Sequence, residues 1–248
     1  PWLKFYFLNS ILTFSFSIIL FYTIWNRQGF VWYIISLLLT LSLVFILTGG
    51  QWQYNQASTP SSGMLRFFWP LLLMFILVKA REKSFYLQLI SILPIFLIGA
   101  FWSFESAFYI SCILFPWVLY FSFFSNLNIK DRFICFFIFP ASFLIVLGCI
   151  SIFYLIKLGN LPDYYSFAEY AFAWTSGHAN TNVNFQGMYI FIIYLLSIIV
   201  LLGALIKKKY ISFSLLFGLI AFLTYFFSRS YEVVIVKQLS FFIFSIFL

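Results

Sequence analysis

Long apolar segments recur along the whole chain, separated by polar connections. Each holds about 20 residues, the length that an α-helix needs to cross the hydrocarbon core of a bilayer. The pattern predicts eight membrane-spanning helices and a ninth that ends with the chain, at about residues 5–25, 30–48, 60–78, 84–102, 106–124, 133–156, 187–206, 210–227 and 233–248. Barrel strands would alternate over about 10 residues. We therefore predict an all-α, polytopic transmembrane bundle.

Two of the predicted outer connections are long. Residues 49–59 are polar and uncharged, whereas residues 157–186 are long enough to contain a helix of their own. In the second connection, Ser166 and Glu169 have the spacing of a capping box at a helix start, and Asp163 is an alternative first residue. We expect this short helix to lie in the membrane interface, because it is rich in aromatic residues.

The connections differ in charge in an alternating way. One set holds nine cations and two acids: Arg27, Lys79, Arg81, Lys83, Lys130, Arg132, Lys207, Lys208 and Lys209, with Glu82 and Asp131. The other set holds two cations and four acids: Lys157 and Arg229, with Glu105, Asp163, Glu169 and Glu232. Cytoplasmic loops are enriched in lysine and arginine. The first set is therefore predicted to be cytoplasmic, and the chain starts outside.

The composition supports a membrane protein, since 64% of the residues are hydrophobic, 8% are charged and the mean hydropathy is +1.06. A soluble domain carries about 25% charged residues. The net charge of +8 does not indicate nucleic acid as a partner, because the cations lie at helix ends. The chain begins at Pro1 without a methionine and ends at Leu248 within an apolar segment. We expect residues 1–248 to be a single transmembrane domain and an internal fragment of a longer protein.

Glu105 lies in the sequence FWSFESAFY, in the short outer turn between the fourth and fifth predicted spans. A carboxylate at this position can act as a base or bind a sugar hydroxyl. It can equally be a helix-start acid that is stabilised by the dipole of the fifth span.

Two arginines are candidate phosphate ligands, because a guanidinium donates two parallel N–H groups to a phosphate. Arg66 falls within the third predicted span if that span begins at Pro60, a residue suited to the first turn of a helix. An arginine there faces a polar cavity or extends to the headgroups. Arg229 and Ser230 lie in the polar turn FFSRSYE, where Arg229 can also pair with Glu232.

The long outer connection holds the other candidates. His178, the single histidine, can transfer protons at neutral pH, although a loop histidine without a fixed partner is more often incidental. Asp163 can serve as an acid or base, or as a helix cap. Tyr164 and Tyr165 can stack on sugar rings, and aromatic residues also concentrate at bilayer surfaces.

Four short segments carry a family resemblance: SSGMLRFFWPLLL around Arg66, GAFWSFESAFY around Glu105, GNLPDYYSFAEY around Asp163 and YFFSRSY around Arg229. They are similar to segments of bacterial GT-C glycosyltransferases and their uncharacterised relatives. The resemblance implies a lipid-phosphate-linked sugar donor that is used on the outer face of a bacterial plasma membrane. The catalytic candidates are then Glu105, Asp163 and His178, and the substrate-binding candidates are Arg66, Arg229, Ser230, Tyr164 and Tyr165.

The chain departs from the family in its first outer loop, where an acidic motif is expected and residues 49–59 hold no carboxylate. Either that motif precedes Pro1 in a longer protein, or the resemblance does not hold. A divalent metal is compatible with the chemistry, but the sequence offers no clear set of metal ligands. The expected partners are membrane lipids and the lipid-linked sugar donor.

Two other functions stay open, as does a non-catalytic membrane scaffold. An O-antigen polymerase or ligase also acts outside on lipid-linked glycans. An arginine-rich outer loop would favour this interpretation, but residues 157–186 contain no arginine. A transporter or flippase could use Arg66 as a substrate site. Interrupted helices in two related halves would favour a transporter, and the sequence shows no such repeat.

Overall fold

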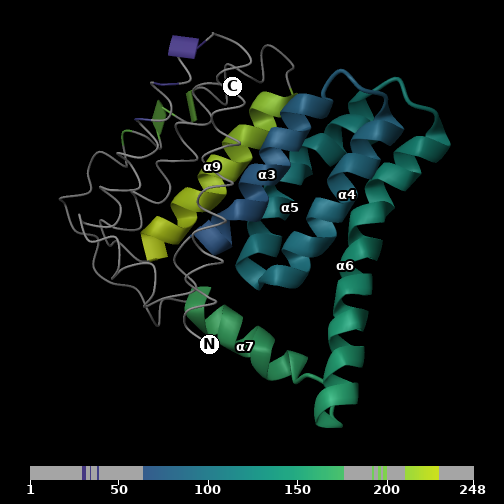
Figure 1. The fold of residues 1–248 in the computed structure, drawn as a ribbon, viewed down its shortest axis with the longest axis vertical. Helices are drawn as coiled ribbons and strands as arrows, with labels where there is room; N and C mark the ends of the chain where they lie inside the picture. Colours follow the sequence, from purple (N-terminus) through teal and green to yellow (C-terminus); the bar gives the residue numbers. More distant parts are fainter. Residues whose placement is uncertain are drawn as a thin grey trace. The chain divides into compact units, whose positions relative to one another are not determined.

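The computed structural model describes a helical protein (Figure 1). It describes residues 64–175 and 210–228, together with single residues in helices: Phe30, Val31, Ile34, Leu38, Ile192, Leu195, Leu196, Ile198 and Ile199. These single residues fall within the predicted spans 30–48 and 187–206. The predicted spans 5–25 and 233–248 lie outside the described residues. Within the described part there are helices and no strands.

The helices are α3 (Met64–Ala80), α4 (Phe85–Trp102), α5 (Phe104–Leu119), the π-helix η2 (Tyr120–Phe124), α6 (Ile129–Leu158), α7 (Tyr164–Thr175) and α9 (Tyr210–Ser228). Within residues 64–175 and 210–228, three helical stretches are long and apolar enough to cross a membrane: α4, α5 with η2, and α6. They confirm a membrane-embedded helical protein and match the predicted spans 84–102, 106–124 and 133–156. α9 matches the predicted span 210–227. The total of eight or nine spans stays a prediction.

The chain divides into two compact units: Pro1–Ile95 with Tyr231–Leu248, and Phe96–Ser230. In the first unit, the turn between α3 and α4 is held by Gln88, whose side chain is buried. Its Nε2 donates to the carbonyl oxygens of Arg81 at 3.4 Å and Lys83 at 2.9 Å. Arg81 also forms a surface ion pair with Glu82 at 3.0 Å. This basic connection is therefore an ordered polar turn.

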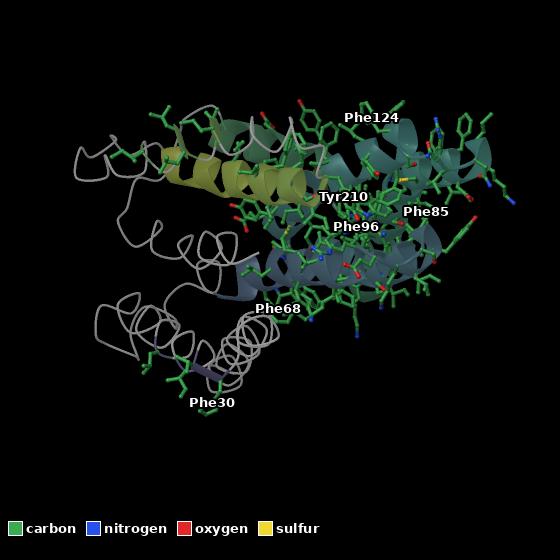
Figure 2. All side chains as sticks on the ribbon, turned by 90° about the horizontal axis from the view of Figure 1, so that it is seen from above. Phe30, Phe68, Phe85, Phe96, Phe124 and Tyr210 are labelled. Atoms are coloured by element: carbon green, nitrogen blue, oxygen red, sulfur yellow. The ribbon has the colours of Figure 1, made fainter. Side chains whose placement is uncertain are left out.

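In the second unit, α5 and α9 pack against each other in opposite directions (Figure 1). The ring of Tyr120 stacks on that of Tyr210 at 4.7 Å between centroids, and Phe115 meets Phe217 at 5.8 Å. Residue numbers fall along α5 as they rise along α9, so the helices are antiparallel. Figure 2 shows Tyr210 among the side chains of the bundle and Phe124 at their edge.

α6 packs on α5 mainly through one face of its first two thirds. The ring of Trp117 meets that of Phe139 edge-on at 6.0 Å, and Ala107 packs with Val146. α5 and α6 are therefore also antiparallel. The buried residues of α6 recur at helical spacing: Asp131, Cys135, Phe139, Ser142 and Val146. The opposite face of this part of α6 exposes apolar side chains, as expected for a helix that faces lipid.

Local capping explains where α6 begins and ends. The side chain of Asn128 accepts a hydrogen bond from the N–H of Asp131 at 2.8 Å. At the other end, Gly159 has a φ of 72°, a left-handed conformation that glycine adopts without strain. The guanidinium of Arg132 donates to the carbonyl oxygens of Ser125 at 2.6 Å and Leu127 at 3.0 Å. Arg132 thus stabilises the connection that follows η2.

Candidate functional site

The turn between α4 and α5 positions Glu105. Ser103 caps α5, because its side-chain oxygen accepts a hydrogen bond from the N–H of Ser106 at 3.1 Å. Glu105 is the second residue of α5, at the positive end of the helix dipole. The structure therefore places Glu105 where the helix-start interpretation expects it. A chemical role is not excluded by this position, since free N–H groups at a helix start also bind anionic groups.

Ser106 is a feature of this turn that the sequence did not single out. Its side chain is fully buried, and its Oγ has no hydrogen-bond partner. Several serines within the described helices, such as Ser111 and Ser142, instead donate to the carbonyl four residues earlier. Ser106 cannot use this solution, because the residue four before it belongs to α4. In the sequence, Ser106 follows Ser103 by three residues, the spacing between a cap residue and the N–H group that it accepts from. This spacing is the signal that could have pointed to Ser106.

The antiparallel pair brings the end of α9 to the same end of the unit as Glu105. Ser103 lies 12 residues before Phe115, and Ser228 lies 11 residues after Phe217. At about 1.5 Å per residue these are axial distances of roughly 18 and 16 Å. Since Phe115 and Phe217 are in contact, the start of α5 and the end of α9 lie at similar heights. Arg229 is the next residue in the chain after Ser228.

Asp163 caps α7, whose first residue is Tyr164, so the helix start proposed at Ser166 is wrong and the alternative start at Asp163 is confirmed. The carboxylate of Asp163 accepts from the N–H of Ser166 at 3.0 Å and from its hydroxyl at 2.6 Å. Ser166 is the third residue of α7 and supplies the donors instead of the cap. Asp163 is followed directly by the helix, at the cap position where a side-chain oxygen accepts from the N–H groups of the first turn.

Tyr164 attaches the start of α7 to α6. Its hydroxyl lies 3.1 Å from the carbonyl oxygen of Leu147, to which it donates, and 2.7 Å from Oγ of Ser151. Ala107, two residues after Glu105, packs on Val146. The starts of α5 and α7 are therefore both anchored to the same two turns of α6. The structure thus brings two predicted site segments to neighbouring positions.

Tyr165, the next residue, points into the surroundings, with 79% of its surface exposed. It is available to a ligand or to lipid, whereas the hydroxyl of Tyr164 is already bonded within the protein. The two adjacent tyrosines therefore have different structural roles, although the sequence predicted the same role for both.

The remaining candidates are less completely described. Arg66 lies in α3, but its side chain is outside the described part, and α3 belongs to the other compact unit. His178, Arg229 and Ser230 also lie outside the described residues. In residues 64–175 and 210–228, no three histidine, cysteine, aspartate or glutamate side chains are grouped so that they could hold a metal ion.

The cap at Asp163 predicts a pH dependence for α7. Hydrogen bonds from the hydroxyl and the N–H of Ser166 favour the carboxylate and lower the pKa of Asp163 below its ordinary value. A lowered pKa in the folded state means that the cap stabilises α7 above the unfolded pKa. This stabilisation is lost as the pH falls through the folded pKa. We expect the amides of Ser166 and Phe167 to lose protection from hydrogen exchange in this acidic range.

The control for this prediction is Asp163→Asn, whose side chain can cap the helix without titrating. In this variant, the protection of the amides at the start of α7 should no longer depend on the protonation of a carboxylate at position 163. Both proteins would be compared by hydrogen exchange at pH 7 and at about pH 3, with rates corrected for the intrinsic effect of pH. Equal pH responses in the two proteins would contradict the assigned role of Asp163.

No protein-family model, curated protein or solved structure matches the chain.

Proposed function

We propose that this chain belongs to an integral-membrane glycosyltransferase that takes its sugar from a lipid-phosphate carrier on the extracytoplasmic face. One observation supports the proposal most directly. The antiparallel packing of α5 and α9 brings the acidic start of α5 level with Ser228, the residue that Arg229 follows. A carboxylate and an arginine segment at one end of a helix pair provide the two charges that such a transfer requires.

Each group has a defined role in this proposal. Glu105 accepts the proton of the acceptor hydroxyl as its oxygen attacks the anomeric carbon of the sugar. The bond between that carbon and the phosphate oxygen breaks, and the lipid phosphate leaves with the electron pair. A guanidinium stabilises the charge on the leaving phosphate through two N–H donors. Arg229, with Ser230, supplies these donors.

The end of α6 and the start of α7, residues 157–165, form a corner that we call the α6–α7 corner. This corner contributes to binding in the same proposal. Asp163 is committed to the cap of α7, so it positions the helix and through it the aromatic side chains. The exposed ring of Tyr165 stacks on a sugar ring. Tyr164 holds the corner against α6, and His178, which follows α7 in the sequence, transfers protons.

A transporter is the second candidate, and the described helices do not favour it. Transporter sites commonly use helices that are interrupted near the middle of the membrane. α4 and α6 each contain a proline, Pro94 and Pro140, yet both continue as helices through it. Within residues 64–175 and 210–228, the one irregular segment in a membrane-crossing stretch is η2, at the end of α5.

The proposal is tested by neutralising the two charges in the full-length protein. Glu105→Gln and Arg229→Gln are each expected to lower the rate of sugar transfer by about 100-fold or more, the scale of losing a general base or a charged ligand. The assay follows a radiolabelled sugar from a polyprenyl-phosphate donor into glycan in isolated membranes. The amount of each variant in the membrane is measured in parallel.

Glu82→Gln and Arg81→Gln provide matched controls. These two side chains form an exposed pair in the turn before α4, at the opposite end of that helix from Ser103. The substitutions remove the same charges and should leave transfer unchanged. Wild-type transfer rates in both Glu105→Gln and Arg229→Gln would reject the proposed site.

A further inference from the structure

The last third of α6, toward Leu158, differs from the rest of the helix in which of its side chains are exposed. As far as Ile150, exposed apolar residues form one stripe and buried residues form the opposite face. From Ile152 to Ile156, every residue is exposed, with fractions between 39% for Tyr154 and 75% for Ile156. Successive residues of an α-helix point about 100° apart. These five apolar side chains therefore surround the helix on all sides.

An all-round apolar surface identifies the kind of surroundings that it fits. A protein partner covers only one face of a helix. Exposing an all-round apolar surface to water costs free energy. Acyl chains contact a helix from every direction. The geometry of residues 152–156 is therefore that of a helix segment immersed in the hydrocarbon of a bilayer.

The length of α6 agrees with this assignment. Between Arg132 and Lys157 there are 24 uncharged residues, an axial length of about 36 Å. The hydrocarbon core is about 30 Å thick, and transmembrane helices tilt by up to about 40°. A tilted α6 therefore crosses the whole core with Arg132 at one boundary and Lys157 at the other. α4, with 18 residues, is about 27 Å long and shorter than the uncharged part of α6.

The packing of α5 on α6 sets the depth of the turn between α4 and α5. Ala107 packs on Val146, and Lys157 lies 11 residues further along α6. Glu105 precedes Ala107 by two residues on the antiparallel helix. Its backbone therefore lies about 13 Å short of Lys157 along α6, which is about 10 Å along the membrane normal at the largest usual tilt.

We propose that phospholipid acyl chains surround α6 as far as Ile156, and that the α4–α5 turn with Glu105 is recessed below the membrane surface on that side. The α6–α7 corner then lies among the headgroups. Its exposed residues suit that region: Leu161 and Tyr165 provide apolar and amphipathic surface, and Lys157 provides a cation at the boundary. This placement is compatible with a polar ligand carried by a lipid, and it does not depend on the transfer reaction.

The proposal is tested by measuring the depth of nitroxide labels on the full chain in phospholipid vesicles. Single cysteines replace Ile152, Phe153, Leu155 and Ile156, one at a time, after the native cysteines have been changed to serine. Oxygen reports contact with hydrocarbon, and a water-soluble nickel chelate reports contact with water. Because all four side chains are exposed, labels there do not fill packed space. A further variant retains Cys149, on the exposed stripe, as its single cysteine and provides a depth reference.

We expect all four labels to be accessible to oxygen and protected from nickel, without a helical period. Labels at residues 139–149 should show a period of about 3.6, because one face of that part is buried. A label at Ser103→Cys should lie about 8 Å deeper than one at Lys157→Cys at the largest usual tilt. A label at Asn160→Cys should contact nickel.

Three results would overturn the proposal. Nickel access at residues 152–156 would place this segment in water. A helical period there would show that protein covers one face, whether residues 187–206 of this chain or a second copy. Equal depths at Ser103→Cys and Lys157→Cys would remove the recess. None of these readouts requires sugar transfer, so the proposed function can fail while this placement holds, and the reverse.

Discussion

Replacing Trp117 with alanine is expected to cause a large loss of stability. The side chain of Trp117 is fully buried, and its ring lies 4.7 Å from that of Phe121 and 6.0 Å from that of Phe139. It therefore connects α5, η2 and α6. Removing a buried tryptophan or phenylalanine typically costs about 3–5 kcal/mol. In a membrane much of this loss comes from missing packing contacts, because lipid tails are as apolar as the protein interior.

The measurement is the free energy of unfolding in mixed micelles, with the melting temperature in mild detergent as a second readout. Phe124→Ala is the matched control, because Phe124 belongs to the adjacent η2 and is 76% exposed. Its removal should change stability by much less than that of Trp117. Similar losses in the two variants would contradict the assigned packing of the second unit.

Replacing Ala107 with phenylalanine should disrupt the crossing of three helices and the turn that holds Glu105. Ala100 of α4, Ala107 of α5 and Val146 of α6 form a buried cluster, and each of them is less than 10% exposed. Small residues let helix backbones approach closely in membranes. A phenyl ring at this crossing has no space, and overpacking typically costs about 1–3 kcal/mol. Glu105 is displaced as the first turn of α5 shifts.

Ala141→Phe is the control for this second prediction, because Ala141 lies on the exposed face of α6. It introduces the same ring where lipid can accommodate it. Ala107→Phe should lower both the free energy of unfolding and the rate of the proposed sugar transfer, and Ala141→Phe should change neither. A stable Ala107→Phe protein with wild-type transfer would show that the crossing does not position Glu105.

Helix positions followed closely from local sequence patterns. The apolar segments predicted α4, α5 with η2, α6 and α9 to within a few residues at each end. This agreement has a simple cause. A span must satisfy its backbone hydrogen bonds internally and match the bilayer, so its composition and length identify it.

Helix ends required more local chemistry than apolar runs provide. Both Asp163 and Ser166 were compatible with the start of α7, and the structure assigns the cap to Asp163. At the end of α5, the apolar run ends correctly at Phe124, but its last turn is a π-helix. A π-turn inserts one residue into the helical register. The apolar pattern does not change when this happens, so the sequence contains no signal for it.

The sequence by itself determined that this is a helical membrane protein and where its described helices lie. These properties depend on local composition, length and charge. Only the tertiary structure decided that α9 returns beside α5, that Tyr164 is bonded to α6, and that Ser106 is buried without a partner. Lipid and protein present similarly apolar surroundings to a helix. An apolar sequence therefore identifies a span without specifying which helix lies beside it.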